Sequence, residues 1–418
     1  MKSLPWIVAA VGAAAAAMSS FAGQTDPAAP SNLLTTPAVA AALEAAKAME
    51  GQTIDDQIRF CEVPAPPFKE RARGEVLRQA FQQAGLRNVR VDRAGNVLGD
   101  RPGMAARPRL VLAAHLDTVF PEETDVTVKR DGAILRGPGI GDDCRGLAVL
   151  IAIVKSLGQA RLQTAGALTF VATVGEEGLG DLRGVRELFA AAMDIDRFVA
   201  IDGPGLGVTN VGAGSRRYRV AFKGPGGHSF SAFGLASPIE AMGRAITRIA
   251  EFQVAKDPKT TFNVGRVGGG TSVNAIPADA WMEVDLRSVD AASLTALDAK
   301  FLRAVDAAVA EENDRRRSPG AITATRERVG DRPAGSTPAG APIVKAAEAV
   351  HRALRLPFVL SESSTDANLP MSLGIPSITI GGGGRGADAH ALTESFDTTD
   401  AWIGTQRALL LTLTLAQK

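Results

Sequence analysis

RLVLAAH, residues 109–115, is an apolar run with the composition of a buried β-strand. Four more segments alternate after it. CRGLAVLIAIVKSLG (144–158) and LRGVRELFAAA (182–192) predict helices, whereas ALTFVATVG (167–175) and RFVAID (197–202) predict further apolar strands. Strands that alternate with helices indicate an α/β fold, in which a mostly parallel sheet is flanked by helices.

The pattern changes near residue 213 and resumes near residue 330. The segment between them predicts the order β-α-β-β-α-β, which is the ferredoxin-like arrangement. We therefore expect a second domain that is inserted into the first. Its expected elements are a strand at 217–224, a helix at 237–253, strands at 260–270 and 280–290, a helix at 293–316 and a strand at 321–329.

The remaining segments flank these two blocks. Upstream, the spacing predicts helices at 38–51 and 70–86, and a hairpin that begins at Val89. Downstream, a helix at 343–354 and a strand at 377–381 resume the α/β pattern.

The N-terminus has the pattern of a signal peptide. Lys2 precedes an apolar run, and small residues follow up to Ala22, which favours cleavage after Ala22. The run is shorter than the roughly 20 residues of a membrane span, although an uncleaved anchor is the alternative. We expect residues 1–22 to be removed on export, to a periplasm or the medium. Residues 23–38 are expected to form a linker rich in Pro, Thr and Ser.

The overall composition excludes several classes of protein. The 418 residues include 46 Lys and Arg and 45 Asp and Glu, a net charge of +1, so the chain lacks the basic excess of a nucleic-acid-binding protein. Two cysteines are too few for a disulfide scaffold or a multi-cysteine zinc module. Apolar residues, at 45%, suffice for a folded core.

Histidine and carboxylate residues gather where the predicted strands end. His115 ends the first strand, and Asp117 shares its face, so that the carboxylate can orient the imidazole toward a metal. A buried structural pair is the alternative. Glu176 and Glu177 follow the next strand, where an exposed charged turn is the alternative, and Asp202 follows the third strand.

Two glycine-rich loops add further candidates. GPGIGDDCRG (137–146) brings Asp142 to the start of a helix, where a capping carboxylate is the alternative. GGGGRGADAHALTE (381–394) contains His390 and lacks the Lys-Ser/Thr pair of a phosphate-binding loop. Imidazoles and carboxylates are ligands that suit zinc, and a bridging carboxylate would hold two ions about 3.5–4 Å apart.

These motifs, in this order, resemble the co-catalytic zinc peptidase and deacylase family. AAHLDTV, GPGIGDD, TVGEEG, the later Asp and the glycine-rich His motif carry the resemblance, which covers nearly the whole chain after the signal peptide. The family includes peptidase T, glutamate carboxypeptidase, aminoacylase, acetylornithine deacetylase and succinyl-diaminopimelate desuccinylase. TVGEEG is most similar to the peptidase T branch.

The resemblance implies a role for each candidate. It implies two zinc ions per subunit, with cobalt or manganese as possible substitutes. Asp117 would orient an imidazole ligand, and Glu176 would be the general base for attack by a hydroxide that bridges the ions. The implied ligands are His115 and Asp202 for one ion, Glu177 and His390 for the other, and Asp142 for both.

The inserted segment resembles the lid and dimerisation domain of the family. GPGGHSF matches a glycine-histidine segment, so His228 would polarise the scissile carbonyl, from the partner subunit in dimeric members. SVNAIP and DLRS make Asn274 and Arg287 candidates for substrate binding, since an Arg suits a substrate carboxylate. The implied division is a catalytic domain at 39–212 and 330–418 and a lid at 213–329.

The chain departs from the family pattern after its Asp pair, where Cys144 replaces the usual Lys. This departure leaves the packing of that loop and the choice of substrate open. A Cys61–Cys144 disulfide is compatible with export, and the sequence does not decide whether it forms. His351 lies in the middle of a predicted helix, and we expect no catalytic role for it.

Three functions remain open at the level of sequence. Our prediction is an exported aminopeptidase of the di- or tripeptidase type, which acts on short peptides. We expect it to form a homodimer through the lid and to have no stable membrane anchor. A deacylase or carboxypeptidase that acts on N-acyl amino acids would share the same site. The third function, of a different class, is a metal-dependent solute-binding protein without turnover, against which the intact Glu176 argues.

Overall fold

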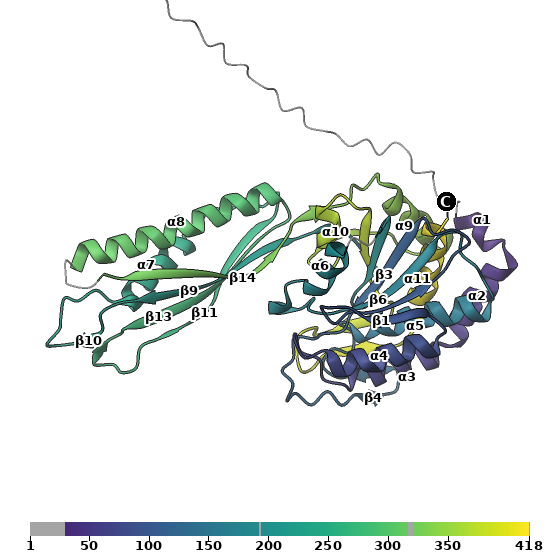
Figure 1. The fold of residues 1–418 in the computed structure, drawn as a ribbon, viewed down its shortest axis with the longest axis horizontal. Coiled ribbons are helices and arrows are strands. Elements are labelled where there is room, and N and C mark those ends of the chain that lie inside the picture. The colour runs from purple at the N-terminus through teal and green to yellow at the C-terminus, as the bar shows by residue number, and fades with distance from the viewer. Residues whose placement is uncertain (1–29, 192–193, 317–320, 418) are drawn as a thin grey trace, which may run out of the picture.

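The computed structural model describes residues 30–191, 194–316 and 321–417. They form a larger domain and an elongated domain that projects from one side of it (Figure 1). The predicted signal peptide lies outside the described residues. Among the helices that the structure describes, none is long and apolar enough to cross a membrane.

The predicted linker is wrong from residue 30 onward. Helix α1 spans Pro30–Leu34, and α2 spans Pro37–Ala48. Both helices begin at a proline, whose fixed φ suits the first helical turn, so these prolines start helices instead of breaking them. A further helix, α3 (Glu50–Cys61), follows where the sequence analysis ended its first helix.

The larger domain is built on a nine-stranded mixed sheet. Its strands run in the order β1-β2-β6-β3-β7-β17-β8-β15, with β16 beside β8. The central four, β6, β3, β7 and β17, are parallel to one another, as predicted, and antiparallel pairs of strands lie toward both edges. The bounds are β1 (Arg87–Val91), β2 (Val97–Arg101), β3 (Arg109–His115), β6 (Ala167–Thr173), β7 (Arg197–Ile201), β8 (Val208–Gly212), β15 (Gly335–Ser336), β16 (Leu360–Ser363) and β17 (Ser377–Ile380).

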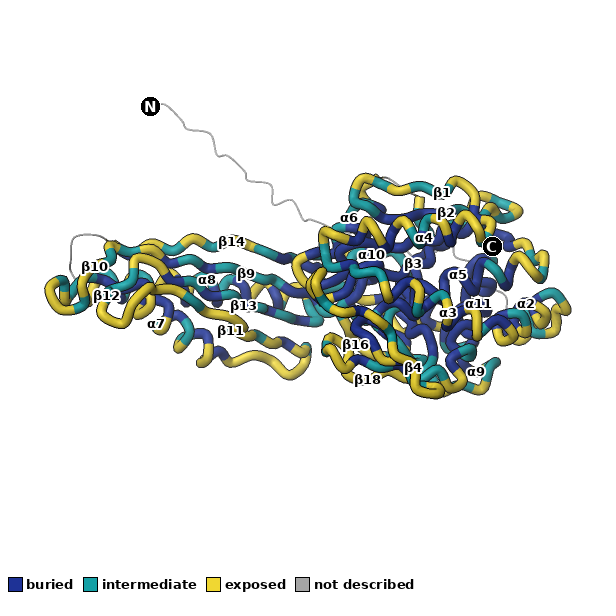
Figure 2. Tube along the Cα trace, turned by 90° about the horizontal axis from the view of Figure 1, so that it is seen from below, coloured by how far each residue is buried: buried dark blue, intermediate teal, exposed yellow. Residues whose placement is uncertain are grey.

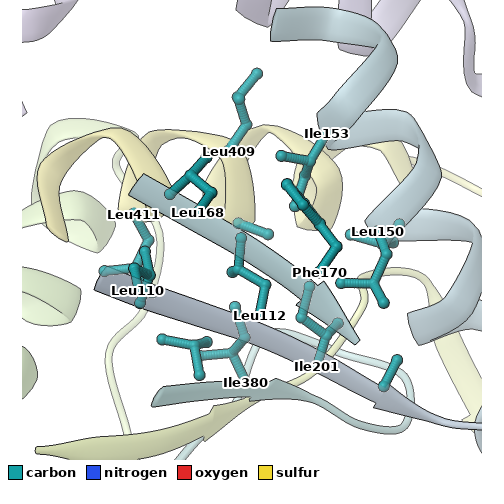
Figure 3. Packing of buried hydrophobic residues seen from close by; sticks show 14 of the residues in the cluster. Leu110, Leu112, Leu150, Ile153, Leu168, Phe170, Ile201, Ile380, Leu409 and Leu411 are labelled. Atoms are coloured by element: carbon teal, nitrogen blue, oxygen red, sulfur yellow. The ribbon is translucent and has the colours of Figure 1, made fainter. Parts of the chain in front are cut away.

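Helices cover both faces of this sheet, so the central strands are buried on both sides. Leu110 and Leu112 of β3 belong to the large core that the sheet forms with α5 and α11 (Figure 3). Val111 and Ala113 face the opposite side, in a core with residues of α6 and α10. The helices are α4 (Arg71–Gln83), α5 (Cys144–Gln159), α6 (Arg183–Ala190), α9 (Pro342–Ala353), α10 (Asn368–Ser372) and α11 (Trp402–Leu415).

A small four-stranded sheet brings the two glycine-rich loops together. It has the order β18-β19-β5-β4, and β19 pairs with β5 through Phe396 and Leu135. Because β5 leads into the loop at 137–143 and β18 and β19 flank His390, this pairing joins segments that are far apart in the sequence. The strands are β4 (Lys129–Asp131), β5 (Ile134–Arg136), β18 (Arg385–Ala387) and β19 (Ser395–Asp397).

The inserted domain has the predicted β-α-β-β-α-β order. Its antiparallel sheet runs β11-β13-β9-β14, and α7 and α8 pack on it around a separate apolar core. The last strand continues to Arg332 instead of ending at residue 329. The elements are β9 (Gly214–Lys223), α7 (Pro238–Ala250), β11 (Thr260–Gly269), β13 (Asp279–Ser288), α8 (Ala291–Arg316) and β14 (Thr323–Arg332).

Two short strands, β10 (Gly227–His228) and β12 (Ala275–Ile276), pair with each other in the inserted domain. They lie at the end of that domain that is remote from the larger domain (Figures 1 and 2). Most residues around them are exposed, including Phe230, Phe233 and Val273.

Candidate active site

The candidate residues meet at one edge of the central sheet. His115 is the last residue of β3, Glu176 and Glu177 follow β6, and Asp202 follows β7. Because these three strands are parallel neighbours, their carboxyl ends lie side by side. In α/β folds such an edge is where binding sites form.

Asp142 lies between the two imidazoles. Its Oδ1 is 2.9 Å from Nε2 of His115, and its Oδ2 is 3.1 Å from Nε2 of His390. Asp202 Oδ1 lies 3.8 Å from the first imidazole, and Glu177 Oε1 lies 2.8 Å from the second. The structure therefore brings together all five residues that the sequence analysis selected as metal ligands.

Two groups of these residues could each hold a metal ion. One is His115, Asp142 and Asp202, and the other is Asp142, Glu177 and His390; within each group the ligand atoms lie within 4.8 Å of one another. Asp142 belongs to both groups, as a bridging ligand would. Nitrogen and carboxylate oxygen donors without a thiolate fit zinc and related divalent ions.

Hydrogen bonds with Glu394 hold the loop that carries Asp142 in place. The carboxylate of Glu394 accepts hydrogen bonds from the backbone N–H of Gly139 (2.8 Å), Gly141 (2.9 Å) and Asp142 (3.1 Å). Gly139 has φ +81°, and a Cβ there would lie 2.6 Å from the Thr118 side chain, so glycine is needed at this turn. The sequence analysis noticed Glu394 only as part of the loop.

Asp143 caps the next helix, whereas Asp142 does not. The side chain of Asp143 accepts from the backbone N–H of Gly146 at 3.0 Å, which is the N-cap interaction of α5. It also accepts from the backbone of His115 at 3.1 Å and of Gly203 at 3.2 Å. Of the adjacent pair, one carboxylate thus builds the scaffold, and the other is free to bind a ligand.

Asp117 acts mainly on the pair of glutamates. Its carboxylate accepts hydrogen bonds from the backbone N–H of Glu176 (3.0 Å) and Glu177 (2.7 Å). His115 Nδ1 lies 2.9 Å from the backbone carbonyl of Asp117 and 3.9 Å from its carboxylate. The expected contact through the Asp117 carboxylate is therefore replaced by one through its main-chain carbonyl, because the side chain is engaged with the turn after β6.

The charges of the site are strongly coupled. Burial alone would lower the pKa of His115, but hydrogen bonds with Asp142 and Asp202 raise it well above its usual range. Hydrogen bonds with Asp142 and Glu177 raise the pKa of His390 to about 10. Burial opposes ionisation of Asp142, yet the two imidazoles hold its pKa below the ordinary value.

Glu176 is buried beside this cluster and contacts a residue that the sequence analysis missed. Burial raises the pKa of Glu176 well above the ordinary value, and the nearby charge of Arg332 opposes this rise. Arg332 Nη1 lies 2.9 Å from Glu176 Oε1. No local pattern pointed to Arg332, since the contact spans 156 residues of the sequence.

Two of the three candidates in the inserted domain lie apart from the cluster, and the third lies at the base of that domain. His228 belongs to β10, at the far end of the domain, and its ring accepts from the backbone N–H of Phe230 at 3.2 Å. Asn274 lies beside it, since its carbonyl accepts from Ser229 at 2.9 Å. Arg287 lies on β13 and pairs with Asp285 at 2.6 Å. One subunit in this conformation does not bring His228 and Asn274 to the strand ends, whereas Arg287 shares its register partner, Ser215, with Arg332.

His351 and the two cysteines, which the sequence analysis also discussed, are buried and form contacts within the protein. His351 is buried in α9, with Nδ1 2.6 Å from the carbonyl of Pro357. Cys61 and Cys144 are free, buried thiols that contact each other, and Cys61 also donates to the carbonyl of Pro138 at 3.4 Å.

The mixed α/β sheet, the inserted ferredoxin-like domain and the cluster of metal-binding groups define a class, that of metal-dependent hydrolases of peptide and amide bonds. Residues 111–414 match the model of Peptidase family M20/M25/M40. The chain belongs to this family, and it is a hydrolase that acts on peptide or linear amide bonds.

Similar proteins span several activities within the family. Succinyl-diaminopimelate desuccinylase from Corynebacterium glutamicum is 25% identical over 55% of this chain and 64% of its own length, so the match spans less than two thirds of that relative. Solved structures with a similar fold include two bacterial peptidases. A tripeptidase from Staphylococcus aureus is 22% identical, with a TM-score of 0.73 over 88% of this chain and 99% of its own. Aminopeptidase PepT from Bacillus cereus is 20% identical, with a TM-score of 0.71 over the same shares.

Proposed function

We propose that the protein is an exported aminopeptidase that binds two zinc ions and hydrolyses short peptides, with Glu176 as the general base. The observation that carries the proposal is the position of Asp142 between His115 and His390, with the buried carboxyl of Glu176 beside them. The similarity in fold to a tripeptidase and to aminopeptidase PepT supports the choice of short peptides.

The residues of the chain would divide the reaction between them. Bound zinc would polarise the scissile carbonyl and lower the pKa of water at the site. His115, Asp142, Glu177, Asp202 and His390 would hold the ions. Glu176 would accept the proton from the attacking water and then donate it to the leaving amine. Its position suits this role, because the carboxyl is buried beside the cluster and its Oε1 is held by Arg332 at 2.9 Å.

Replacement of the general base tests this assignment. Glu176→Gln should lower kcat by about a thousandfold, within the usual contribution of a general base, while two zinc ions remain bound. Metal analysis and a panel of di- and tripeptides would measure both effects, with the exposed Glu122→Gln as the matched control. Full activity of Glu176→Gln would remove this residue from its role.

A deacylase or carboxypeptidase is the second candidate, and the similarity to succinyl-diaminopimelate desuccinylase favours it. The two functions differ in what they require at the amine of the substrate. If peptides with a free α-amine are cleaved and their N-acetylated forms are not, the aminopeptidase is supported. The reverse preference would establish the deacylase. Tight ligand binding without hydrolysis of any compound would instead indicate a solute-binding protein.

We also propose that the protein is a homodimer in which His228 of one subunit completes the site of the other. Its distance from the cluster of its own chain and its exposure support this arrangement. Subunit mixing tests it. Glu176→Gln and His228→Ala should each be inactive alone, whereas a mixture should recover about a quarter of wild-type activity, since half of the dimers would carry one intact site. No recovery, with exchange of subunits verified, would contradict action in trans.

Export is part of the same proposal, on the pattern of residues 1–22. Expression of the full chain in a bacterium with a periplasm, followed by N-terminal sequencing of the active protein, tests it. A mature chain that begins near residue 23 is expected. An active protein that begins at Met1 would overturn it.

A further inference from the structure

Arg332 occupies the place where the inserted domain rejoins the larger domain. It is the last residue of β14, and its register partner is Ser215, at the start of β9. Its exposed fraction is 3%, so the charge of its guanidinium must be satisfied by the protein.

The guanidinium holds Glu176 through two different groups. Nη1 donates to Glu176 Oε1 at 2.9 Å and to the hydroxyl of Ser364 at 3.1 Å. Nη2 donates to the backbone carbonyl of Glu176. One side chain of the inserted domain thus fixes both the carboxylate and the main chain of the proposed general base.

Two further hydrogen bonds attach the turn after β6, which carries Glu176, to the base of the inserted domain. Asp331 donates its backbone N–H to Asp181 Oδ1 at 2.8 Å, and Arg217 donates to the carbonyl of Gly178 at 2.5 Å. The turn after β6 therefore meets the inserted domain at three points, of which Arg332 is the one that touches Glu176.

The two segments that connect the domains, near Ala213 and near Pro333, are also held together. The side-chain amide of Asn368 is buried and donates to the carbonyl of Ala213 at 2.9 Å and to that of Pro333 at 3.1 Å. Both segments are thereby fixed to α10 of the larger domain. Because Arg332 directly precedes Pro333, it lies at the point about which the inserted domain would turn.

We propose that Arg332 is a positioning residue for Glu176, and that it couples the orientation of the inserted domain to the placement of the Glu176 carboxylate. The inference rests on the proposed role of Glu176. A general base must lie within hydrogen-bond reach of the proton that it accepts, and an error of about 1 Å can cost about a hundredfold in rate. The planar fork of an arginine fixes two acceptors at once, which the single ammonium of a lysine does not.

Substitution of Arg332 tests the positioning role. Arg332→Ala should lower kcat by about a hundredfold with little change in KM, and Arg332→Lys should recover only part of the loss. Added guanidinium ion should restore part of the activity of Arg332→Ala, an effect that a merely structural role would not give. Zinc content should stay at the wild-type value. The matched control is Arg326→Ala on the same strand, whose partner Asp306 lies on the surface of the inserted domain.

A distance measurement tests the coupling without reference to activity. Both native cysteines are buried, so spin labels can be placed on Val273→Cys and Met104→Cys, which are exposed positions of the two domains. Arg332→Ala should shift or broaden the distribution of distances in the zinc-loaded protein, whereas Arg326→Ala should not. An unchanged distribution would overturn the coupling, and unchanged kcat in Arg332→Ala would overturn the positioning role. Full activity of Glu176→Gln would instead refute the proposed function itself, so the two failures are distinguishable.

Discussion

The two sheets of the molecule are built on different patterns. In β3 every residue from Leu110 to His115 is buried, because helices cover both faces of the central sheet. In β13 buried residues alternate with partly exposed ones, because α7 and α8 cover one face only. Strands covered on both sides have only their ends free for polar groups, and the cluster of candidate metal ligands lies at those ends. The inserted sheet keeps an accessible polar face.

Among the substitutions considered, Asp142→Ala at the ends of the central strands should have the largest effect on metal content and activity, whereas a substitution in the inserted sheet should have little. Loss of the shared ligand should abolish binding of at least one zinc ion and lower kcat/KM by at least about a thousandfold, since the metal supplies several kcal/mol of stabilisation. Metal analysis of purified protein and peptide assays would measure it. Asp279→Ala, an exposed position of β13, is the control. If Asp142→Ala kept two ions and full activity, the strand ends would not be the metal site.

Leu112→Ala tests the doubly covered sheet. This side chain is 1% exposed, and its truncation should lower the free energy of unfolding of the larger domain by about 3 kcal/mol through lost burial and a residual cavity. Urea unfolding monitored by circular dichroism would measure it. Val267→Ala, an exposed position of β11, should change little. A loss near zero for Leu112→Ala would mean that this core tolerates cavities.

Zinc binding should release protons, and these protons should come from imidazoles of the larger domain such as that of His390. The pKa of His390 is raised to about 10 without metal, so at pH 7.5 its ring is protonated and must lose a proton to bind an ion. The affinity for zinc should therefore fall by at least about tenfold for each unit of decrease in pH. Calorimetry in buffers of different ionisation enthalpy would count the protons. His228→Ala should leave the count unchanged, whereas a count of zero in the wild type would contradict the coupling described here.

Thr325→Ala should have the smallest effect. This residue is exposed on β14, an edge strand of the inserted sheet, and its truncation should change the free energy of unfolding by less than about 0.5 kcal/mol. Thermal unfolding at two protein concentrations would measure it. A larger, concentration-dependent loss would show that a second copy of the chain covers this edge.

The sequence predicted the elements whose pattern is strong. The apolar run at 109–115 matches β3 residue for residue, and all six main elements of the inserted domain were expected. Helix α11 was missed because it is buried along most of its length, with polar residues such as Arg407 and Thr412 among the buried ones, and so lacks the amphipathic spacing that marks a surface helix. The strands β18 and β19 were missed because three residues give no usable period.

The site divides in the same way. Residues at strand ends, such as His115 and Asp202, could be placed from local sequence, because the ends of neighbouring parallel strands must meet. The contacts of Glu394 and Arg332 could not be predicted, because they are far apart in the sequence. Glu394 binds backbone groups that precede it by 252 to 255 residues, and Arg332 binds Glu176, which precedes it by 156 residues. The pairing of loops and domains sets such contacts, and a single sequence carries no periodic signal for it.

The hold of Glu394 on the loop of Asp142 has a consequence for how the protein matures. The loop at 137–143 leaves the ribosome long before its support does, because Glu394 follows Gly139 by 255 residues. A nascent or truncated chain that stops short of the last glycine-rich segment lacks both this support and the second imidazole. We therefore expect the two candidate metal groups to be completed only after the chain has been made through Glu394, and a polypeptide that stops before this residue to lack hydrolase activity.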